Sequence, residues 1–443
     1  MIERTYIKNA HEKIGNEILI NGWVNVRRDH GKLIFLDIRD VSGVIQAVAL
    51  PSHKEAHDTA KELRPEWVIS MKGIVNKRPE KMINSDSPTG DIELEITSVE
   101  ILSRAEELPF DKDGELNLDT YFDYLPLTLR TERSRAIFSV QAKIIAAFRN
   151  FLTTNDFVEI QPPKIIGEDA EGGANSFSFD YFGHTAHLAQ SPQFYKQIMV
   201  GVFEKVFAAT SVYRAEKHST TRHLNEYTSL DLEMGFISDH KDIMQTERAL
   251  LANIMETLEK TSKKEFALLG AKIPTVPEEI PFLKLREAQK LLTDALGTDC
   301  TNEPDLEPQH ERWLCEYSQK IYGSDFIFIT HFPLSKRPMY TFEDPDDKGY
   351  ARGFDLLFRG IEITTGGQRI HDYQTLVESI KKKGLDPEKF SFYLQAFKYG
   401  MPPHGGFGMG LERLTAKLLG LENVKEAALF PRDINRIDKL LSQ

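Results

Sequence analysis

Residues 212–236 read VYRAEKHSTTRHLNEYTSLDLEMGF, and this stretch decides the predicted fold. Apolar ends around a polar middle predict two strands joined by a loop. If 212–216 is a strand, Arg214 and Glu216 share a face, where an arginine could grip a phosphate and a glutamate could accept from an amino group. The second strand alternates, with Leu230, Leu232, Met234 and Phe236 on one face and Ser229, Asp231 and Glu233 on the other. The apolar face is expected in the core, and the polar face either lines a site or, more commonly for such a pattern, meets solvent.

A second segment, FDLLFRGIEI at 354–363, predicts a hairpin that turns at Arg359-Gly360. In that register Leu357 faces Glu362, and Asp355 lies diagonally across from Glu362, roughly 7 Å away on the same face. Two such carboxylates, together with substrate phosphate oxygens, are ligands that Mg²⁺ prefers. A surface hairpin whose charges pair with Arg or Lys is the alternative.

A third segment, GMPPHGGFGMGLERL at 400–414, joins dense glycines to a predicted helix that begins at Leu411. Glycines let a backbone approach a ligand closely, and Arg413 falls in the first turn of that helix. Neither GxxxxGK[ST] nor GxGxxG occurs, so the sequence does not support a Walker or Rossmann loop.

Composition sets outer limits on function. The chain has 443 residues, 28% charged residues and a net charge of −12, which suits a multidomain globular enzyme. An acidic protein can still hold nucleic acid through a local basic patch. Cys300 and Cys315 form no CxxC pair, which argues against structural zinc and disulfides and fits the cytoplasm. No run approaches the roughly 18 apolar residues that span a bilayer, and no secretory signal is expected.

The first hundred residues predict a small β-barrel. Five short strands are expected at 18–24, 33–38, 44–50, 67–72 and 92–96. That number fits an OB-fold, although another small barrel or sandwich fits it equally well. Residues 104–131 are predicted to form a polar linker, and apolar residues at three- and four-residue steps predict a helix over 132–152. The predicted fold class is α+β.

Together the three segments resemble the signature motifs of class II aminoacyl-tRNA synthetases, and in detail the aspartyl enzymes of subclass b. Motif 1 falls around 140–165, with FVEIQPP at 157–163, and the family places its proline, here Pro163, at a dimer interface. Motif 2 falls at 207–236 and motif 3 at 405–420, while QSPQFYKQ at 190–197 and ITTGGQRIH at 363–371 resemble strings typical of the aspartyl enzymes. The resemblance implies an OB-fold anticodon-binding domain at 1–103, a hinge at 104–131, and a catalytic domain at 132–443 built on an antiparallel sheet flanked by helices.

The resemblance also implies roles in an ATP site. Arg214 would bind the α-phosphate and Glu216 the adenine amino group. His223 and Arg413 would hold the γ-phosphate end, and Arg413 would also stack on adenine. Arg214, His223 and Arg413 are the expected catalytic residues. Asp355, Glu362 and Thr365 would ligate Mg²⁺, with Glu362 also contacting ATP.

For the amino acid, the family pattern implies that Glu171 and Asp231 meet the substrate ammonium, while Gln193, Lys196 and Arg369 surround its carboxylates. Asparaginyl enzymes usually lack the lysine at the position of Lys196. A fixed cation favours aspartate over neutral asparagine, and unpaired buried groups can separate two substrates by about 10⁴-fold.

GWVNVRRDHGKLIF at 22–35 resembles the anticodon-binding barrel of the same family. Phe35 would stack on a base, Gln46 and Glu93 would read base edges, and Arg28 would contact the same loop. On its own, Phe35 is more often a core residue than a stacking platform. His30 stands where relaxed enzymes, which also charge tRNA-Asn, often differ from strict ones.

The resemblance thus predicts a cytoplasmic homodimer that activates L-aspartate with ATP and transfers it to the 3′ end of tRNA-Asp. Charging of tRNA-Asn as well is a hypothesis, because the catalytic part resembles the compact archaeal type, with only 238–332 between motifs 2 and 3, while the barrel resembles the bacterial type. Lys425 also stands where an arginine is usual. The alternatives are an asparaginyl-tRNA synthetase and a non-catalytic paralogue of the same fold.

Overall fold

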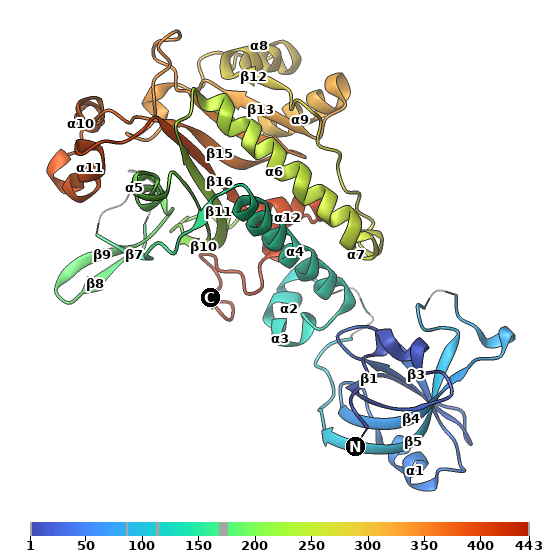
Figure 1. Ribbon diagram of the computed structural model, residues 1–443. Helices are drawn as coiled ribbons and strands as arrows, with labels where there is room; N and C mark the ends of the chain where they lie inside the picture. Colours follow the sequence, from blue (N-terminus) through green and yellow to red (C-terminus); the bar gives the residue numbers. More distant parts are fainter. Residues whose placement is uncertain (1, 86, 112–113, 115, 168–175, 442–443) are drawn as a thin grey trace. The chain divides into compact units, whose positions relative to one another are not determined.

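The computed structural model describes residues 2–85, 87–111, 114, 116–167 and 176–441. The chain forms two compact units, Met1–Leu116 and Asn117–Gln443, and each is described by itself (Figure 1). Cys300 and Cys315 are buried and free. Among the described helices, none has the length and apolar character needed to cross a membrane.

The first unit is a closed five-stranded barrel in the order β1-β2-β3-β5-β4, as the sequence predicts. Its strands are β1 (Glu17–Asp29), β2 (Ile34–Arg39), β3 (Val44–Ala49), β4 (Val68–Lys77) and β5 (Ile92–Ser103), with η1 (Ile7–Lys13), α1 (Lys54–Glu62) and η2 (Glu80–Met82) between or before them. Alternate residues such as Ile20, Leu36 and Ile45 fill the barrel and are 0% exposed. β3 and β5 pair in parallel, and the other neighbours are antiparallel.

The second unit is built on an eight-stranded sheet in the order β12-β13-β14-β15-β16-β11-β10-β6. These strands are β6 (Val158–Glu159), β10 (Lys205–Tyr213), β11 (Glu226–Gly235), β12 (Phe282–Lys284), β13 (Phe326–Thr330), β14 (Gly353–Phe358), β15 (Ile361–Arg369) and β16 (His404–Gly410). Its six central strands are antiparallel, and only the short outermost strands β6 and β12 pair in parallel with their neighbours. A separate sheet contains β7 (Ile165–Ile166), β9 (His184–Leu188) and β8 (Ser178–Tyr181).

Long helices cover one face of the eight-stranded sheet. α4 (Glu132–Thr154) and α6 (His240–Thr261) lie across it, beside α12 (Leu411–Leu419), and share one hydrophobic core with the central strands (Figure 1). The Thr131 hydroxyl accepts from Ser134 N and so starts α4, which runs two residues beyond its predicted end. The remaining helices are α2 (Leu118–Asp123), α3 (Leu125–Thr128), α5 (Gln193–Phe203), α7 (Lys263–Leu268), α8 (Leu285–Leu296), α9 (Pro308–Tyr322), α10 (Tyr373–Lys382), α11 (Ser391–Lys398), η3 (Leu334–Lys336), η4 (Pro387–Phe390) and η5 (Val424–Ala427). The α+β class and the sheet flanked by helices are confirmed.

Several local predictions were wrong. β10 ends at Tyr213, so Arg214 and Glu216 lie in the following loop and not on a strand face. β11 ends at Gly235, and Phe236, with φ of 58°, turns outward and is 71% exposed instead of joining the core. The stretch 104–131, expected as a linker, contains α2 and α3.

The hairpin at 354–363 turns at Arg359-Gly360, and Leu357 faces Glu362 as predicted. Both turn residues have positive φ, 45° and 88°, which is the geometry of a type I′ turn. A register shift next to this turn leaves Ile363 without a partner, so Asp355 pairs with Thr365. The bulge keeps Asp355 and Thr365 directly opposed, which the simple diagonal register did not anticipate.

The buried carboxyl of Glu247, on α6, allows the packing of this helix against the eight-stranded sheet to be tested. Glu247 on α6 is 0% exposed, and no hydrogen bond of regular geometry reaches its oxygens from the described residues. Burial raises its pKa from 4.5 to about 8, the Thr364 hydroxyl opposes this shift, and the charge of Asp355 adds to it. The folded chain therefore keeps a proton that the unfolded chain releases between these pH values.

Because the pKa is higher in the folded state, stability is expected to fall as pH rises from 4.5 to 8. Glu247→Gln mimics the protonated form, so it should be more stable than wild type above pH 8, by about 5 kcal/mol, and similar near pH 4.5. Urea unfolding at both pH values measures this. Glu256→Gln, on the exposed face of the same helix, is the control and should show no such pH dependence; an equal response of both variants would contradict the account.

Candidate active site

A cavity of about 770 Å³ is lined by Ser229 and Asp231, whereas Leu230 and Leu232 of the same strand pack in the core with α4 and α6, so the cavity lies on the opposite face of the sheet. Ten of the residues predicted for ATP, metal and amino acid line it: Gln193, Lys196, Arg214, Glu216, His223, Asp231, Glu362, Thr365, Arg369 and Arg413. Asp355 lies just outside this lining, and Glu171 lies outside the described residues. The neighbouring strands β11, β16 and β15 bring the three sequence segments together, because motif 3 pairs with motif 2 on one side and with the 361–369 strand on the other.

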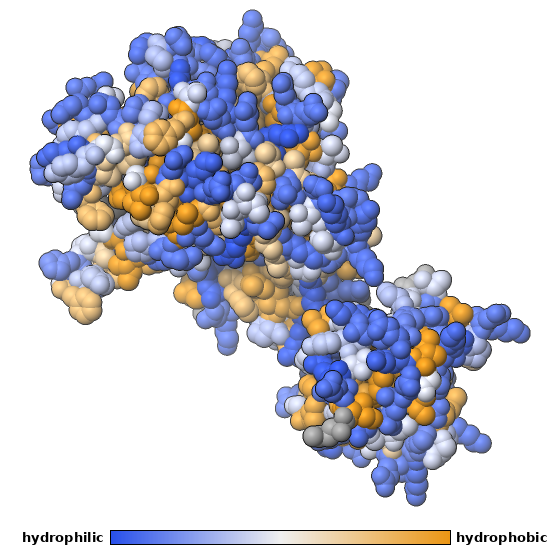
Figure 2. Space-filling view, in the orientation of Figure 1, coloured by the Kyte–Doolittle hydropathy of each residue, from blue (hydrophilic) through white to orange (hydrophobic). Residues whose placement is uncertain are grey.

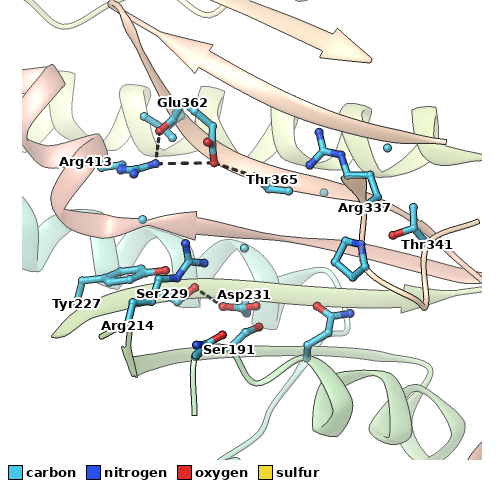
Figure 3. A pocket seen from close by; sticks show the side chains of 18 of the residues that line it. Ser191, Arg214, Tyr227, Ser229, Asp231, Arg337, Thr341, Glu362, Thr365 and Arg413 are labelled. Carbon is cyan, nitrogen blue, oxygen red and sulfur yellow. Dashed lines mark hydrogen bonds and ion pairs between the residues drawn. The ribbon is translucent and has the colours of Figure 1, made fainter. Parts of the chain in front are cut away.

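The motif 2 loop shapes one end of the cavity. Asn225 closes it, donating from its side chain to the carbonyl of Arg214 at 2.6 Å and to that of Glu216 at 3.2 Å. The Arg214 guanidinium lies 5.6 Å from the centre of the Tyr227 ring and points into the cavity (Figure 3). Arg214 and Glu216 thus both reach the cavity although they leave the strand.

Arg413 and Glu362 face each other at the same end (Figure 3). Arg413 Nη1 donates to the Glu362 carbonyl at 3.0 Å and lies 3.8 Å from Oε1 of its carboxylate. That carboxylate also accepts from the Thr365 hydroxyl at 2.8 Å. His223 Nδ1 meets the Thr220 hydroxyl at 2.7 Å, and burial, together with the charge of Arg413, lowers its pKa. This end therefore offers a neutral histidine and two arginines, a set suited to an anionic ligand.

Asp355 and Glu362 fit a divalent cation. Arg337 donates to Asp355 Oδ2 at 2.9 Å, while Oδ1 is buried and accepts no hydrogen bond from the described residues. Burial raises the pKa of Asp355 to about 7, against the opposing charge of Arg337, and Glu362 raises it further. An orphaned carboxylate oxygen beside a second carboxylate is a donor set that a hard cation would satisfy. Arg337, from the turn after η3, was not predicted and carries no sequence signal that would have identified it.

The opposite end of the cavity holds a buried cluster of charges. Lys196 from α5 is 1% exposed, with Nζ 2.8 Å from Asp231 Oδ2 and 3.4 Å from Glu233 Oε2. Arg369 Nε donates to Glu233 Oε1 at 3.0 Å, and its Nη2 donates to the Gly406 carbonyl at 2.9 Å. Two predicted cations are thus bound to two adjacent carboxylates of β11. We call Lys196, Arg369, Asp231 and Glu233 the charge cluster.

Glu233 is the member of the charge cluster to which the sequence reasoning assigned no role. Alternation placed it on the polar face of β11 but gave it no partner. The glycines of motif 3 make room for it, since a Cβ at Gly406 would lie 2.3 Å from Glu233 Oε2 and 2.1 Å from the Leu232 carbonyl. Gly406 therefore allows β16 to pack closely against β11. Gly408 and Gly410 line the cavity, as predicted.

Neutral groups complete the floor around the charge cluster. Gln193 Nε2 donates to Gln197 Oε1 at 3.1 Å, and Gln197 in turn contacts His404 Nε2 at 2.9 Å. Burial lowers the pKa of His404 to about 4, so it adds no charge near pH 7. Lys164 is half-buried beside Thr210, and burial lowers its pKa against the opposing charge of Asp231. Gln193 is therefore held beside the cluster as a neutral hydrogen-bonding group.

The barrel carries its predicted residues on one outer face. Arg28 forms a bidentate pair with Asp37, at 2.7 Å for both contacts, and Gln46 donates to Glu93 at 3.2 Å. Phe35 is half-buried between Ile34 and Leu36, which point into the barrel, so it is not a core residue. The ring centroids of His30 and Phe35 lie 5.7 Å apart. The five predicted positions thus occupy adjacent strands and the turn between β1 and β2.

A second group of potential metal ligands lies between α8 and α9. Ligand atoms of Cys300, Glu303 and His310 lie within 4.8 Å of one another. Protein groups already satisfy two of them, because Cys300 donates to the Thr298 carbonyl and His310 Nδ1 accepts from Glu307 N. The contacts are those of a helix start and not of an open site.

Comparison with known proteins agrees with this geometry. The family model "tRNA synthetases class II (D, K and N)" matches residues 117–434, and the model "OB-fold nucleic acid binding domain" matches residues 18–102. The chain belongs to the class II tRNA synthetases. This synthetase is 47% identical to the aspartate–tRNA(Asp/Asn) ligase of Thermus thermophilus over 438 residues, 98% of this chain and 99% of that one. It is 38% identical to the aspartate–tRNA(Asp) ligase of Pyrococcus furiosus, over 98% of this chain and 99% of that one.

Solved structures of the same family are also similar. The asparaginyl-tRNA synthetase of Pyrococcus horikoshii, in complex with asparaginyl-adenylate, matches with a TM-score of 0.91 and 32% identity over 99% of this chain and 100% of that one. A putative aspartyl-tRNA synthetase of Leishmania major Friedlin matches with a TM-score of 0.88 and 30% identity over 98% of this chain and 95% of that one. Backbone shape alone thus does not separate the two amino acids, and the side chains of the cavity must do so.

Proposed function

We propose that this synthetase activates L-aspartate with ATP, releasing pyrophosphate, and transfers the aspartyl group to tRNA. The observation that carries the choice of aspartate is the charge cluster. Its four groups contact one another directly and balance, with two cations against two carboxylates. A substrate that enters must keep this buried balance, because an unpaired charge in such a place costs several kcal/mol.

Aspartate keeps the balance. Its ammonium would bind Asp231 and displace Lys196, which would keep only its 3.4 Å contact with Glu233, a carboxylate already shared with Arg369. The side-chain carboxylate of aspartate supplies a new partner between Lys196 and Arg369, while Glu233 stays bound to Arg369. Asparagine would bring the same ammonium and α-carboxylate but a neutral side chain, leaving buried Lys196 with only its longer contact to Glu233. Gln193 would contact the substrate alongside, and we propose Glu171 as a second ammonium ligand.

The other end of the cavity supports the ATP part of the proposal. Arg214 would neutralise the α-phosphate, Glu216 would accept from the adenine amino group, and His223 with Arg413 would bind the γ-phosphate end. Asp355, Glu362 and Thr365 would hold Mg²⁺, which when bound neutralises phosphate charge. The α-carboxylate of aspartate attacks the α-phosphorus, the bond to pyrophosphate breaks, and the residues act by positioning and charge alone. A non-catalytic paralogue has no need of so complete a set.

Exposed apolar side chains support a homodimer built around motif 1. β6 is an edge strand of the large sheet, and Val158 in it is 38% exposed. Figure 2 shows hydrophobic residues gathered on the larger unit around α5 and the β7–β9 sheet. Those exposed most include Phe182 at 88%, Val202 at 61% and Ile165 at 48%. We propose that a second copy covers this surface, with Pro163 at the contact, because unpaired edges and apolar patches are sites of association.

The two free thiols are consistent with the cytoplasm as the place of action.

The barrel would select the tRNA. Phe35 offers a half-exposed ring for stacking, and Arg28, Gln46 and Glu93 offer polar atoms beside it, next to His30. The similar proteins include ligases named for tRNA(Asp) and ligases named for tRNA(Asp/Asn). We propose tRNA-Asp as the substrate and tRNA-Asn as a second one.

The role of Lys196 can be tested by substitution. Lys196→Leu removes the cation that aspartate needs, so ATP–pyrophosphate exchange with aspartate should fall at least about 100-fold, with the KM for ATP little changed. Lys382→Leu, on the exposed face of α10, is the matched control and should behave as wild type. Retention of aspartate exchange in the Lys196 variant would refute the assignment.

The breadth of tRNA charging is tested by aminoacylation of purified tRNA-Asp and tRNA-Asn with radiolabelled aspartate. Product is expected on both, because the chain is 47% identical to an aspartate–tRNA(Asp/Asn) ligase and 38% identical to one named for tRNA(Asp). Product on tRNA-Asp alone would restrict the enzyme to one tRNA and leave the choice of aspartate intact. No product on either tRNA, with exchange intact, would contradict the transfer step.

A further inference from the structure

One carboxylate outside the three motifs contacts two separate segments at the end of the cavity that is proposed to bind ATP. Glu311 lies in the first turn of α9, and its side chain is 8% exposed. Its Oε2 accepts from Nη2 of Arg222 in the motif 2 loop and from the backbone N of Glu362 at 3.0 Å. Glu311 does not line the cavity, whereas Arg222 and Glu362 both do. The same oxygen thus fixes the loop that follows β10 and the start of β15.

The charges around Glu311 explain why a carboxylate is needed there. Burial lowers the pKa of Lys417, and the nearby charges of Arg222 and Arg312 lower it further. Arg413 Nη1 lies 3.8 Å from Oε1 of Glu362. Among the described groups, Glu311 is the carboxylate in contact with Arg222. Without it, Arg222 would be repelled by its neighbours and would be free to leave the cavity wall.

The position of Arg222 in the motif 2 loop connects Glu311 to the residues proposed to bind ATP. His223 is the next residue, and Arg222 is one of the groups whose charge lowers the pKa of His223. Nη1 of Arg222 is buried and donates no hydrogen bond within the described part of the chain, so one nitrogen is committed to Glu311 and another remains for a ligand. A fixed guanidinium loses less freedom on binding than a mobile one.

We propose that Glu311 is a positioning residue for ATP: through Arg222 and the backbone of Glu362, it holds the motif 2 loop and β15 in the geometry that binds the triphosphate. This inference rests on the proposed use of the cavity for ATP. It assigns a function to α9, a helix that none of the three motifs includes.

The test compares Glu311→Gln with Glu316→Gln, an exposed glutamate on the same helix. Glutamine keeps the shape and removes the charge. In ATP–pyrophosphate exchange, the KM for ATP should rise about tenfold or more in Glu311→Gln, while the KM for aspartate stays within error. Glu316→Gln should match wild type. An unchanged KM for ATP, or equal rises in both KM values, would overturn the proposal.

A double variant shows whether Glu311 acts through Arg222. Arg222→Gln alone should raise the KM for ATP, and adding Glu311→Gln should raise it little further, because the partner is already gone. Multiplied effects would mean that Glu311 acts independently and would contradict the proposed route. If wild type itself shows no exchange, the proposed function fails instead, and that outcome is distinct from a failure of this inference.

Discussion

The charge cluster beneath the cavity is the constraint on which the rest of the catalytic unit depends. Lys196 is 1% exposed and Glu233 is 0% exposed, so neither can keep its charge without the other groups. Their contact requires α5 to lie on β11 and requires β16 to pack against β11 with no side chain at Gly406. The order of the central strands, β15-β16-β11-β10, then follows from the need to place Arg369 beside Glu233.

The same strands separate the two ends of the cavity. β15 carries Glu362 and Thr365 toward the end of the cavity proposed for ATP and Arg369 toward the charge cluster, so one strand would contact both proposed substrates. β11 carries Asp231 at the boundary, where an amino acid would meet ATP. Because each of these side chains is held by neighbours before a ligand arrives, the site needs little rearrangement to bind charge. Asp231 is the exception, since its present partner Lys196 must move to a new one.

Much of this could be predicted from the sequence because the pattern was local. Alternation in 229–235 defined β11, the Arg359-Gly360 pair defined a turn, and the spacing of apolar residues defined α4. Ten of the residues that line the cavity followed from motif resemblance. The errors arose where contacts between residues distant in sequence determine the local conformation or the strand register. Asn225 pulls Arg214 and Glu216 out of the strand, the bulge at Ile363 resets the partner of Asp355, and Phe236 turns outward at a positive φ. Arg337 and Glu311 could not be found, because each acts on a residue distant in sequence.

The central claim is that buried charge balance selects aspartate. ATP–pyrophosphate exchange by the wild-type enzyme, with aspartate and asparagine measured side by side at equal concentration, tests it most directly. The account predicts exchange with aspartate and a rate lower by about 10⁴-fold with asparagine, since only aspartate restores a partner to Lys196. Exchange driven by asparagine and not by aspartate would contradict the account.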